Sequence, residues 1–172
     1  KLEYAYGQHG EFDFMGANFS YPEDQVNGVR MLSNGPYRVW KNRMKGMNIG
    51  VWDKPYNNTV TGASWDYPEF KGYYSEFYWA TIDSKEQPFT VVSGTEDLYL
   101  RLFTPKFPED ARNAQAPFPD GNISFMHAIP PIGTKFMAAE KLGPQGKQNS
   151  FNGGGSRTEP FSAILYFDFS VQ

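Results

Sequence analysis

The stretch Phe161-Ser162-Ala163-Ile164-Leu165-Tyr166-Phe167-Asp168-Phe169-Ser170-Val171 alternates apolar side chains with mostly polar ones. Every odd-numbered position in it is apolar, while serine, tyrosine and aspartate occupy most of the even-numbered positions. Successive side chains of a β-strand point to opposite faces of the sheet, so a period of two indicates a strand with one face in the core. We therefore predict a strand over residues 161–171.

The same period recurs in other parts of the chain. Residues 96–103 are predicted to turn Leu98, Leu100 and Leu102 inward and Tyr99 and Arg101 outward. Residues 73–82 carry aromatic side chains on both faces, as expected for a strand that is covered on both sides. Further strands are predicted at residues 11–21, 26–32, 37–40, 89–93 and 123–128, where β-branched and aromatic residues gather.

Helix signals are weak, because no stretch of twelve residues carries apolar side chains at helical spacing and only residues 138–142 suit a single turn. Seventeen Gly and thirteen Pro favour many short elements joined by turns. Residues 42–71, 104–122 and 129–160 are predicted to be long irregular segments, which tend to be functional or to pack on a neighbour. The fold expected is all-β, one antiparallel β-sandwich over residues 1–172 with long irregular loops and little helix.

Composition and charge exclude several classes of function. A net charge of −3 provides no basic field for nucleic acid, and no apolar run is long enough to span a membrane. The absence of Cys removes thiolate chemistry, and neither of the two His residues has zinc-site or nucleophile-motif spacing. We therefore assign no cofactor, no metal and no catalytic residue. The chain begins at Lys1 without a signal-like segment, so we expect a processed product or an excised piece of a larger protein.

Aromatic residues make up 17% of the sequence and are dense in residues 34–74. Flat rings interleaved with Arg, Asn and carboxylate groups suit the stacking face and the hydroxyl groups of a sugar. The alternative is that these rings are core and interface anchors, as aromatic residues commonly are. Paired carboxylates for glycoside hydrolysis are conceivable among Asp53, Asp66, Glu69 and Glu76, but nineteen acidic residues make some close pair nearly inevitable, and solvated or ion-paired side chains are the favoured explanation.

Two segments in this aromatic region resemble a known family. They are Asn34-Gly35-Pro36-Tyr37-Arg38-Val39-Trp40-Lys41-Asn42-Arg43 and Tyr67-Pro68-Glu69-Phe70-Lys71-Gly72-Tyr73, with Val51-Trp52 between them. Together they resemble the C-terminal domain of bacterial β-galactosidases of glycoside hydrolase family 2. In that domain a hydrophobic strand leads into Gly-x-Gly-Pro and then an acid–Arg pair. Here residues 29–32 lead into Ser33-Asn34-Gly35-Pro36, and Asn42-Arg43 stands at the place of the pair.

The resemblance implies a piece of an enzyme with no catalytic residue of its own. In that family a galactose mutarotase-like super-sandwich packs on a catalytic TIM barrel, which holds both catalytic Glu residues and is absent from this sequence. The sandwich lends an aromatic loop to the sugar site. That loop falls within residues 133–143 here, with Phe136 as its only aromatic residue. A galactoside-type carbohydrate and a bacterial periplasmic or secreted location are the further implications.

The leading prediction is therefore a non-catalytic domain that braces the barrel and lines the rim of the carbohydrate site. The candidate carbohydrate-binding or domain-interface residues are Arg38, Trp40, Arg43, Trp52, Trp65, Tyr67, Glu69 and Phe136. One alternative is a free-standing carbohydrate-binding module, and another is a structural or surface-adhesion β-sandwich. The catalytic barrel and a carbohydrate are the expected partners.

Overall fold

The computed structural model describes residues 1–7, 14–38, 44–55, 72–103, 120–129 and 160–170. The strands are β1 (Leu2–Tyr6), β2 (Met15–Phe19), β3 (Val26–Gly35), β4 (Asn48–Pro55), β5 (Trp79–Ser84), β6 (Phe89–Ser93), β7 (Tyr99–Leu102), β8 (Ile123–Ala128) and β9 (Phe161–Asp168). Within these residues the one helical element is the 3-10 turn η1 (Glu23–Gln25).

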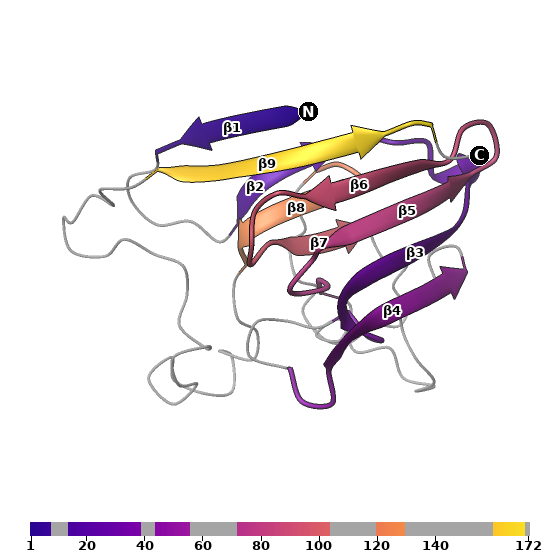
Figure 1. Cartoon of the computed structure of the whole chain (residues 1–172), viewed down its shortest axis with the longest axis horizontal. Coiled ribbons are helices and arrows are strands. Elements are labelled where there is room, and N and C mark those ends of the chain that lie inside the picture. Colours follow the sequence, from indigo (N-terminus) through magenta and orange to yellow (C-terminus); the bar gives the residue numbers. More distant parts are fainter. Residues whose placement is uncertain (8–13, 39–43, 56–71, 104–119, 130–159, 171–172) are drawn as a thin grey trace, which may run out of the picture.

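The strands form two antiparallel sheets that pack as a sandwich (Figure 1). The larger sheet has six strands in the order β1-β9-β6-β5-β3-β4, and the smaller has three in the order β2-β8-β7. In Figure 1 the smaller sheet lies behind the larger one. The predicted all-β class and antiparallel sandwich are thus confirmed.

Strand β9 confirms the alternation from which its prediction was made. Phe161, Ala163 and Leu165 are buried, and β9 lies between β1 and β6 in the larger sheet. The strand ends at Asp168, whose Oδ1 accepts a hydrogen bond of 2.9 Å from the backbone N–H of Ser170. Residues 169 and 170 therefore leave the sheet, and the predicted inward face ends before Phe169, which is exposed.

The core lies between the inner faces of the two sheets. The larger sheet contributes Met31, Ala80, Ile82, Val91 and Leu165, and the smaller contributes Leu100, Leu102, Ile123 and Phe125. The ring of Phe125 lies 5.4 Å from that of Phe77 and 6.0 Å from that of Phe19, between centroids. Burial of these apolar side chains is the main favourable contribution to folding.

Residues 96–103 follow the prediction except at Arg101. Leu98, Leu100 and Leu102 are buried as expected, but Arg101 is also fully buried instead of facing solvent. Its Nε donates to Ser124 Oγ at 3.1 Å and its Nη2 donates to the Gly121 carbonyl at 2.7 Å. A buried guanidinium is tolerated where such acceptors meet it, so the outward assignment was wrong.

Two predicted strands differ from the structure. Residues 73–82 are not one strand, because Tyr74 forms only an isolated bridge with Leu100 and β5 begins at Trp79. Between them Glu76 has a φ of 48°, which interrupts an extended chain. In the predicted strand 37–40, Tyr37 and Arg38 are not in a strand, and residues 39 and 40 lie outside the described residues.

The segment 42–71, predicted to be irregular, contains β4. This strand pairs with β3 along its whole length, from Gly28 opposite Pro55 to Gly35 opposite Asn48. β4 is an edge strand of the larger sheet, as is β1, which was also not predicted. The expected turn at residues 138–142 lies outside the described residues, as do most of the segments 104–122 and 129–160.

Candidate functional site

A cleft of about 370 Å³ is the strongest candidate site within the described residues. We call it the cleft, and its lining residues are Asn34, Met44, Ser75, Glu76, Asp97, Tyr99 and His127. They come from both sheets and from the segments that precede β4, β5 and β7. Most of them carry polar side chains, which distinguishes the cleft from the apolar core.

Strand pairing and local hydrogen bonds position the floor of the cleft. Tyr99 starts β7 and pairs with Met126 of β8, so the neighbouring His127 lies close to it. Asn34, near the end of β3, donates from its backbone N–H to the Ser75 carbonyl at 2.9 Å. Its Nδ2 also donates to Ser75 Oγ at 3.1 Å, which fixes the orientation of the amide.

The two carboxylate residues of the cleft have unusual backbone conformations. Glu76 has a φ of 48° and Asp97 has a φ of 62°. This left-handed region is uncommon for residues that carry a side chain, and such residues cluster at functional sites. Glu76 is half-buried and Asp97 is exposed, so both carboxylates remain accessible to a ligand.

The electrostatics of the cleft converge on Tyr99. Burial raises the pKa of the Tyr99 hydroxyl, and the nearby carboxylates of Asp97 and Glu76 raise it further. Its hydroxyl therefore keeps its proton and can donate a hydrogen bond. The described residues that line the cleft include two carboxylates and neither Lys nor Arg.

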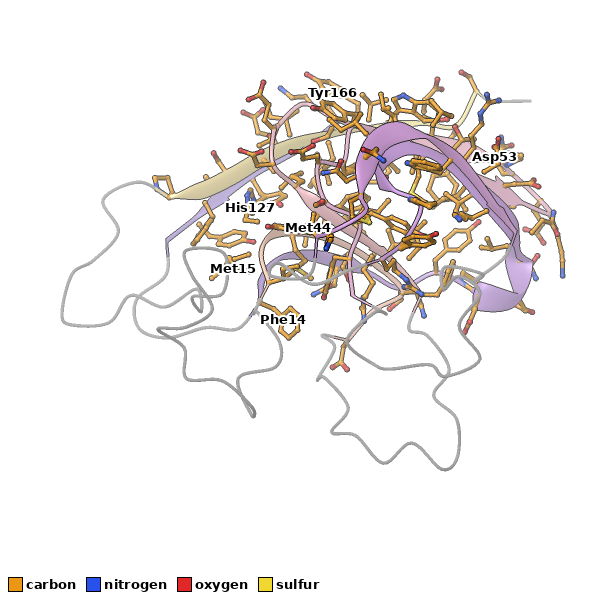
Figure 2. The ribbon with its side chains drawn as sticks, turned by 90° about the horizontal axis from the view of Figure 1, so that it is seen from below. Phe14, Met15, Met44, Asp53, His127 and Tyr166 are labelled. Carbon is orange, nitrogen blue, oxygen red and sulfur yellow. The ribbon has the colours of Figure 1, made fainter. Side chains whose placement is uncertain are left out.

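Aromatic rings hold His127 at the wall of the cleft. The Tyr4 hydroxyl and His127 Nε2 are hydrogen-bonded at 3.1 Å. The Tyr4 ring meets the imidazole edge to face at 5.7 Å, and the Phe161 ring lies 5.5 Å from it. Figure 2 shows His127 and Met44 together on the side of the larger sheet opposite to Tyr166 and Asp53.

The arrangement suits hydrogen bonding to a polar, uncharged or cationic ligand. Carboxylates accept, the Tyr99 hydroxyl and the Asn34 amide donate, and the imidazole does either. Within the part of the chain that the structure describes, no three His, Asp or Glu side chains come close enough to hold a metal ion.

Arg38, a candidate from the sequence, is completely buried. Its Nη1 donates to the carbonyl oxygens of Leu102 at 2.9 Å and Phe103 at 2.7 Å. Burial lowers the pKa of the guanidinium to about 10, with a smaller contribution in the same direction from Arg101. In this structure Arg38 therefore ties the loop after β3 to the end of β7 and does not reach solvent.

Trp52, the second described candidate, packs on the inner side of β4. Its Nε1 donates to the Ser33 carbonyl at 3.1 Å, and its ring lies against Gly35 and Gly50. The side chain is half-buried and contacts the core cluster. Trp52 thus covers the edge of the core, and it does not line the cleft.

The structure describes two of the eight predicted candidates, Arg38 and Trp52. Arg38 and Trp52 lie apart from the lining of the cleft. The other six candidates, Trp40, Arg43, Trp65, Tyr67, Glu69 and Phe136, lie outside the described residues and stay predictions. Of the cleft residues, sequence reasoning had singled out only Glu76 as a possible functional acid.

The outer face of the larger sheet carries a second feature, which we call the outward row. It consists of five residues in register on adjacent strands: Val51, Leu32, Trp79, Val92 and Tyr166. Val51, Val92 and Tyr166 are 49%, 40% and 46% exposed. Four inter-strand spacings make this apolar row roughly 19 Å long.

A polar row lies beside the outward row, displaced from it by two residues on each of the five strands. Its members are Asp53, Arg30, Thr81, Thr90 and Asp168. Arg30 Nε lies 3.5 Å from Asp53 Oδ1, and the hydroxyls of Thr81 and Thr90 are 2.8 Å apart. The outer face is therefore amphipathic, with a defined boundary between its apolar and polar halves.

Comparisons with protein-family models, with curated protein sequences and with solved structures give no match to this chain. No helix within the described residues has the length and apolar character needed to cross a bilayer.

Proposed function

We propose that this chain is a non-catalytic β-sandwich domain of a β-galactosidase-like glycoside hydrolase and that it contacts carbohydrate through the cleft. The observation that carries the proposal is the convergence of Glu76, Asp97, Tyr99 and His127 on one cleft. The resemblance of residues 34–73 to the C-terminal domain of that family supplies the wider context.

Sugar recognition explains this set of side chains well. Each sugar hydroxyl can both donate and accept, and the cleft offers carboxylate acceptors beside the Tyr99 and Asn34 donors. An aromatic ring next to such groups provides the apolar surface that the C–H face of a sugar requires. A volume of about 370 Å³ lies at the low end of small-molecule sites, which favours one or two sugar rings over a long chain.

Binding suits the cleft better than hydrolysis. A general acid in a glycoside hydrolase is kept protonated at neutral pH by an apolar, desolvated pocket. Asp97 is exposed and Glu76 is half-buried, so neither carboxyl group has such a pocket. The two carboxylates are therefore assigned to ligand binding.

The outward row supports a further part of the proposed function, in which this domain packs on a catalytic barrel. A contiguous apolar surface beside a polar margin is typical of a surface that contacts another domain. The outward row and the cleft lie on different sides of the larger sheet (Figure 2), so docking by the one leaves the other open. We therefore expect the outward row to face the barrel of the parent protein.

Calorimetric titration with galactose, lactose and methyl β-galactoside tests the cleft. We expect saturable binding that Asp97→Asn and Tyr99→Phe each weaken about fivefold or more, as for one lost hydrogen bond to a charged or buried partner. Asp53→Asn is the matched control, because it neutralises an exposed carboxylate in the polar row of the outer face. Absence of binding, or equal loss in all three variants, contradicts the proposal.

Two further measurements address the rest of the proposed function. Turnover of nitrophenyl β-galactoside that Glu76→Gln abolishes contradicts the non-catalytic assignment. A reading frame that continues upstream into a barrel is expected. A stop codon directly upstream, together with glycan binding, favours the free-standing carbohydrate-binding module instead. A chain that binds no glycan and has no upstream barrel favours the structural or adhesion sandwich.

A further inference from the structure

The backbone holds Asn34 on both of its sides at the floor of the cleft. On one side Asn34 is paired in register with Ile49 of β4, and on the other its N–H donates to the Ser75 carbonyl at 2.9 Å. Ser75 belongs to the segment before β5 and is only 6% exposed. The backbones of Asn34 and Ser75 are therefore fixed relative to each other, which brings their side chains within reach.

A second hydrogen bond joins the two side chains. Asn34 Nδ2 donates to Ser75 Oγ at 3.1 Å. The last torsion of an Asn side chain is soft, and a half-turn about it exchanges the donor NH2 group for the acceptor oxygen. The bond to Ser75 keeps Nδ2 on the Ser75 side, so Oδ1 takes a constant place on the opposite side of the amide.

The two side chains retain hydrogen-bonding capacity for a ligand. A hydroxyl group that accepts one bond keeps its own proton to donate, and the amide keeps its carbonyl oxygen. Among the described residues, no group donates to Asn34 Oδ1 and none accepts the proton of the Ser75 hydroxyl. Both residues line the cleft, so one acceptor and one donor lie side by side there.

We propose that Ser75 is a positioning residue, which holds the Asn34 amide so that the two side chains together bind one hydroxyl group of a ligand. That hydroxyl donates to Asn34 Oδ1 and accepts from the Ser75 hydroxyl, a combination that an ether or a carbonyl group cannot provide. The ligand class is therefore a polyol. This recognition deepens the proposed function and rests on it, whereas the positioning of the Asn34 amide does not.

The positioning role is measured without a ligand, by ¹⁵N relaxation of the Asn34 side-chain amide. An Asn34→Asp variant assigns the signal, because it lacks this group. We expect an order parameter of about 0.8 in the unaltered chain and below about 0.6 in Ser75→Ala, the range of a flexible group. Ser33→Ala is the matched control, because it removes a buried hydroxyl that contacts only the Asn34 carbonyl, at 3.4 Å, and should leave the amide rigid.

Titration with methyl β-galactoside and its monodeoxy and monofluoro analogues identifies the hydroxyl group that is bound. We expect one ring position at which either replacement weakens binding to the unaltered chain about fivefold or more, as for one lost hydrogen bond. In Asn34→Ala the same replacement should cost less than about twofold, because its partner is already gone. Ser33→Ala should show the same dependence on ring position as the unaltered chain.

The outcomes separate the two proposals. A flexible Asn34 amide in the unaltered chain, or one that Ser75→Ala leaves rigid, overturns the role of Ser75. Equal losses in the unaltered chain and in Asn34→Ala at every ring position overturn the recognition of a hydroxyl group. If the amide behaves as expected and no galactoside binds, the positioning role stands and the proposed function fails. Circular dichroism of each variant verifies that the fold is retained.

Discussion

Gly35→Ala provides the sharpest test of how the larger sheet is built at its β4 edge. A Cβ on Gly35 would lie 2.5, 2.6 and 2.8 Å from Nε1, Cδ1 and Cε2 of Trp52. Separations under 3 Å are not tolerated, so the indole ring has to move. A Cβ on Gly50 would lie 3.0 and 3.2 Å from Cζ2 and Cε2 of the same ring, which demands a much smaller shift.

The destabilisation by Gly35→Ala follows from the interactions that the Trp52 ring loses when it is displaced. Displacement breaks the 3.1 Å hydrogen bond from Trp52 Nε1 to the Ser33 carbonyl, a loss of about 1 kcal/mol. Exposing the buried part of the ring costs about 2 kcal/mol more, within the ~1.5–3 kcal/mol typical of burying a large apolar side chain. Alanine recovers about 0.5–1 kcal/mol by restricting the unfolded chain. The free energy of unfolding should therefore fall by about 2–3 kcal/mol.

Urea unfolding followed by far-ultraviolet circular dichroism measures this free energy. Gly50→Ala is expected to cost about 1 kcal/mol or less, and Gly7→Ala, which meets no atom within 4 Å, should be neutral or slightly stabilising. The decisive comparison is Gly35→Ala in a Trp52→Leu background, where the clash is gone and its cost should fall below about 1 kcal/mol. The reasoning is refuted if Gly35→Ala is as stable as the parent, or costs the same in both backgrounds.

Three further predictions concern buried groups. Burial raises the pKa of Tyr74 to about 12 from the usual 10.0, so its contribution is complete below pH 10 and lost as pH rises towards 12. Between pH 8 and 11.5 the free energy of unfolding in urea should fall more for the parent than for Tyr74→Phe, by about 2 kcal/mol. Arg38→Met removes the donor to two buried carbonyls and should cost about 2–4 kcal/mol in urea unfolding, whereas Arg30→Met, in an exposed ion pair, should cost ~0.5 kcal/mol or less. Gly16→Ala would place a Cβ 2.6 Å from Met126 Sδ and 2.7 Å from its Cα, so we expect a loss of at least about 2 kcal/mol; a thermal midpoint within about 2 °C of the parent would contradict this.

The alternation of apolar and polar residues correctly predicted those strands that have one face in the core and the other towards solvent. In β6 and β9 the inward apolar side chains are buried, so a period of two is visible in the sequence itself. Strand β4 was not predicted, because Gly50 occupies one of its inward positions, where an apolar residue was expected. The structure explains that glycine, since the Trp52 ring from two residues along lies over it.

The outward assignment of Arg101 was wrong for a different reason. Sequence patterning treats a charged side chain as outward, which is correct for most surface positions. Arg101 is buried because its acceptors, Ser124 and the Gly121 carbonyl, come from a segment far along the chain. Such partners have no signature in the sequence near position 101.

The cleft could not be predicted as a unit. Its residues converge because β7 pairs with β8 and because Glu76 and Asp97 adopt left-handed backbone conformations in two turns. Neither cause leaves a spacing motif, so Tyr99 and His127 looked like an ordinary strand residue and an isolated imidazole. The predicted site residues instead followed aromatic density, which in Trp52 reflects packing of the sheet edge.

The pairing of β1 with β9 has a consequence for how the fold is reached. Leu2 pairs with Leu165, so the first described strand joins the larger sheet only through the last described strand. Closing such a distant contact is slow, and folding of this chain should fall towards the millisecond-to-second end of the range for small domains. During synthesis β1 emerges before its partner β9, and we expect the contact between Tyr4 and His127 to form after β9 has been added. The wall of the cleft is therefore among the last parts of the molecule to form.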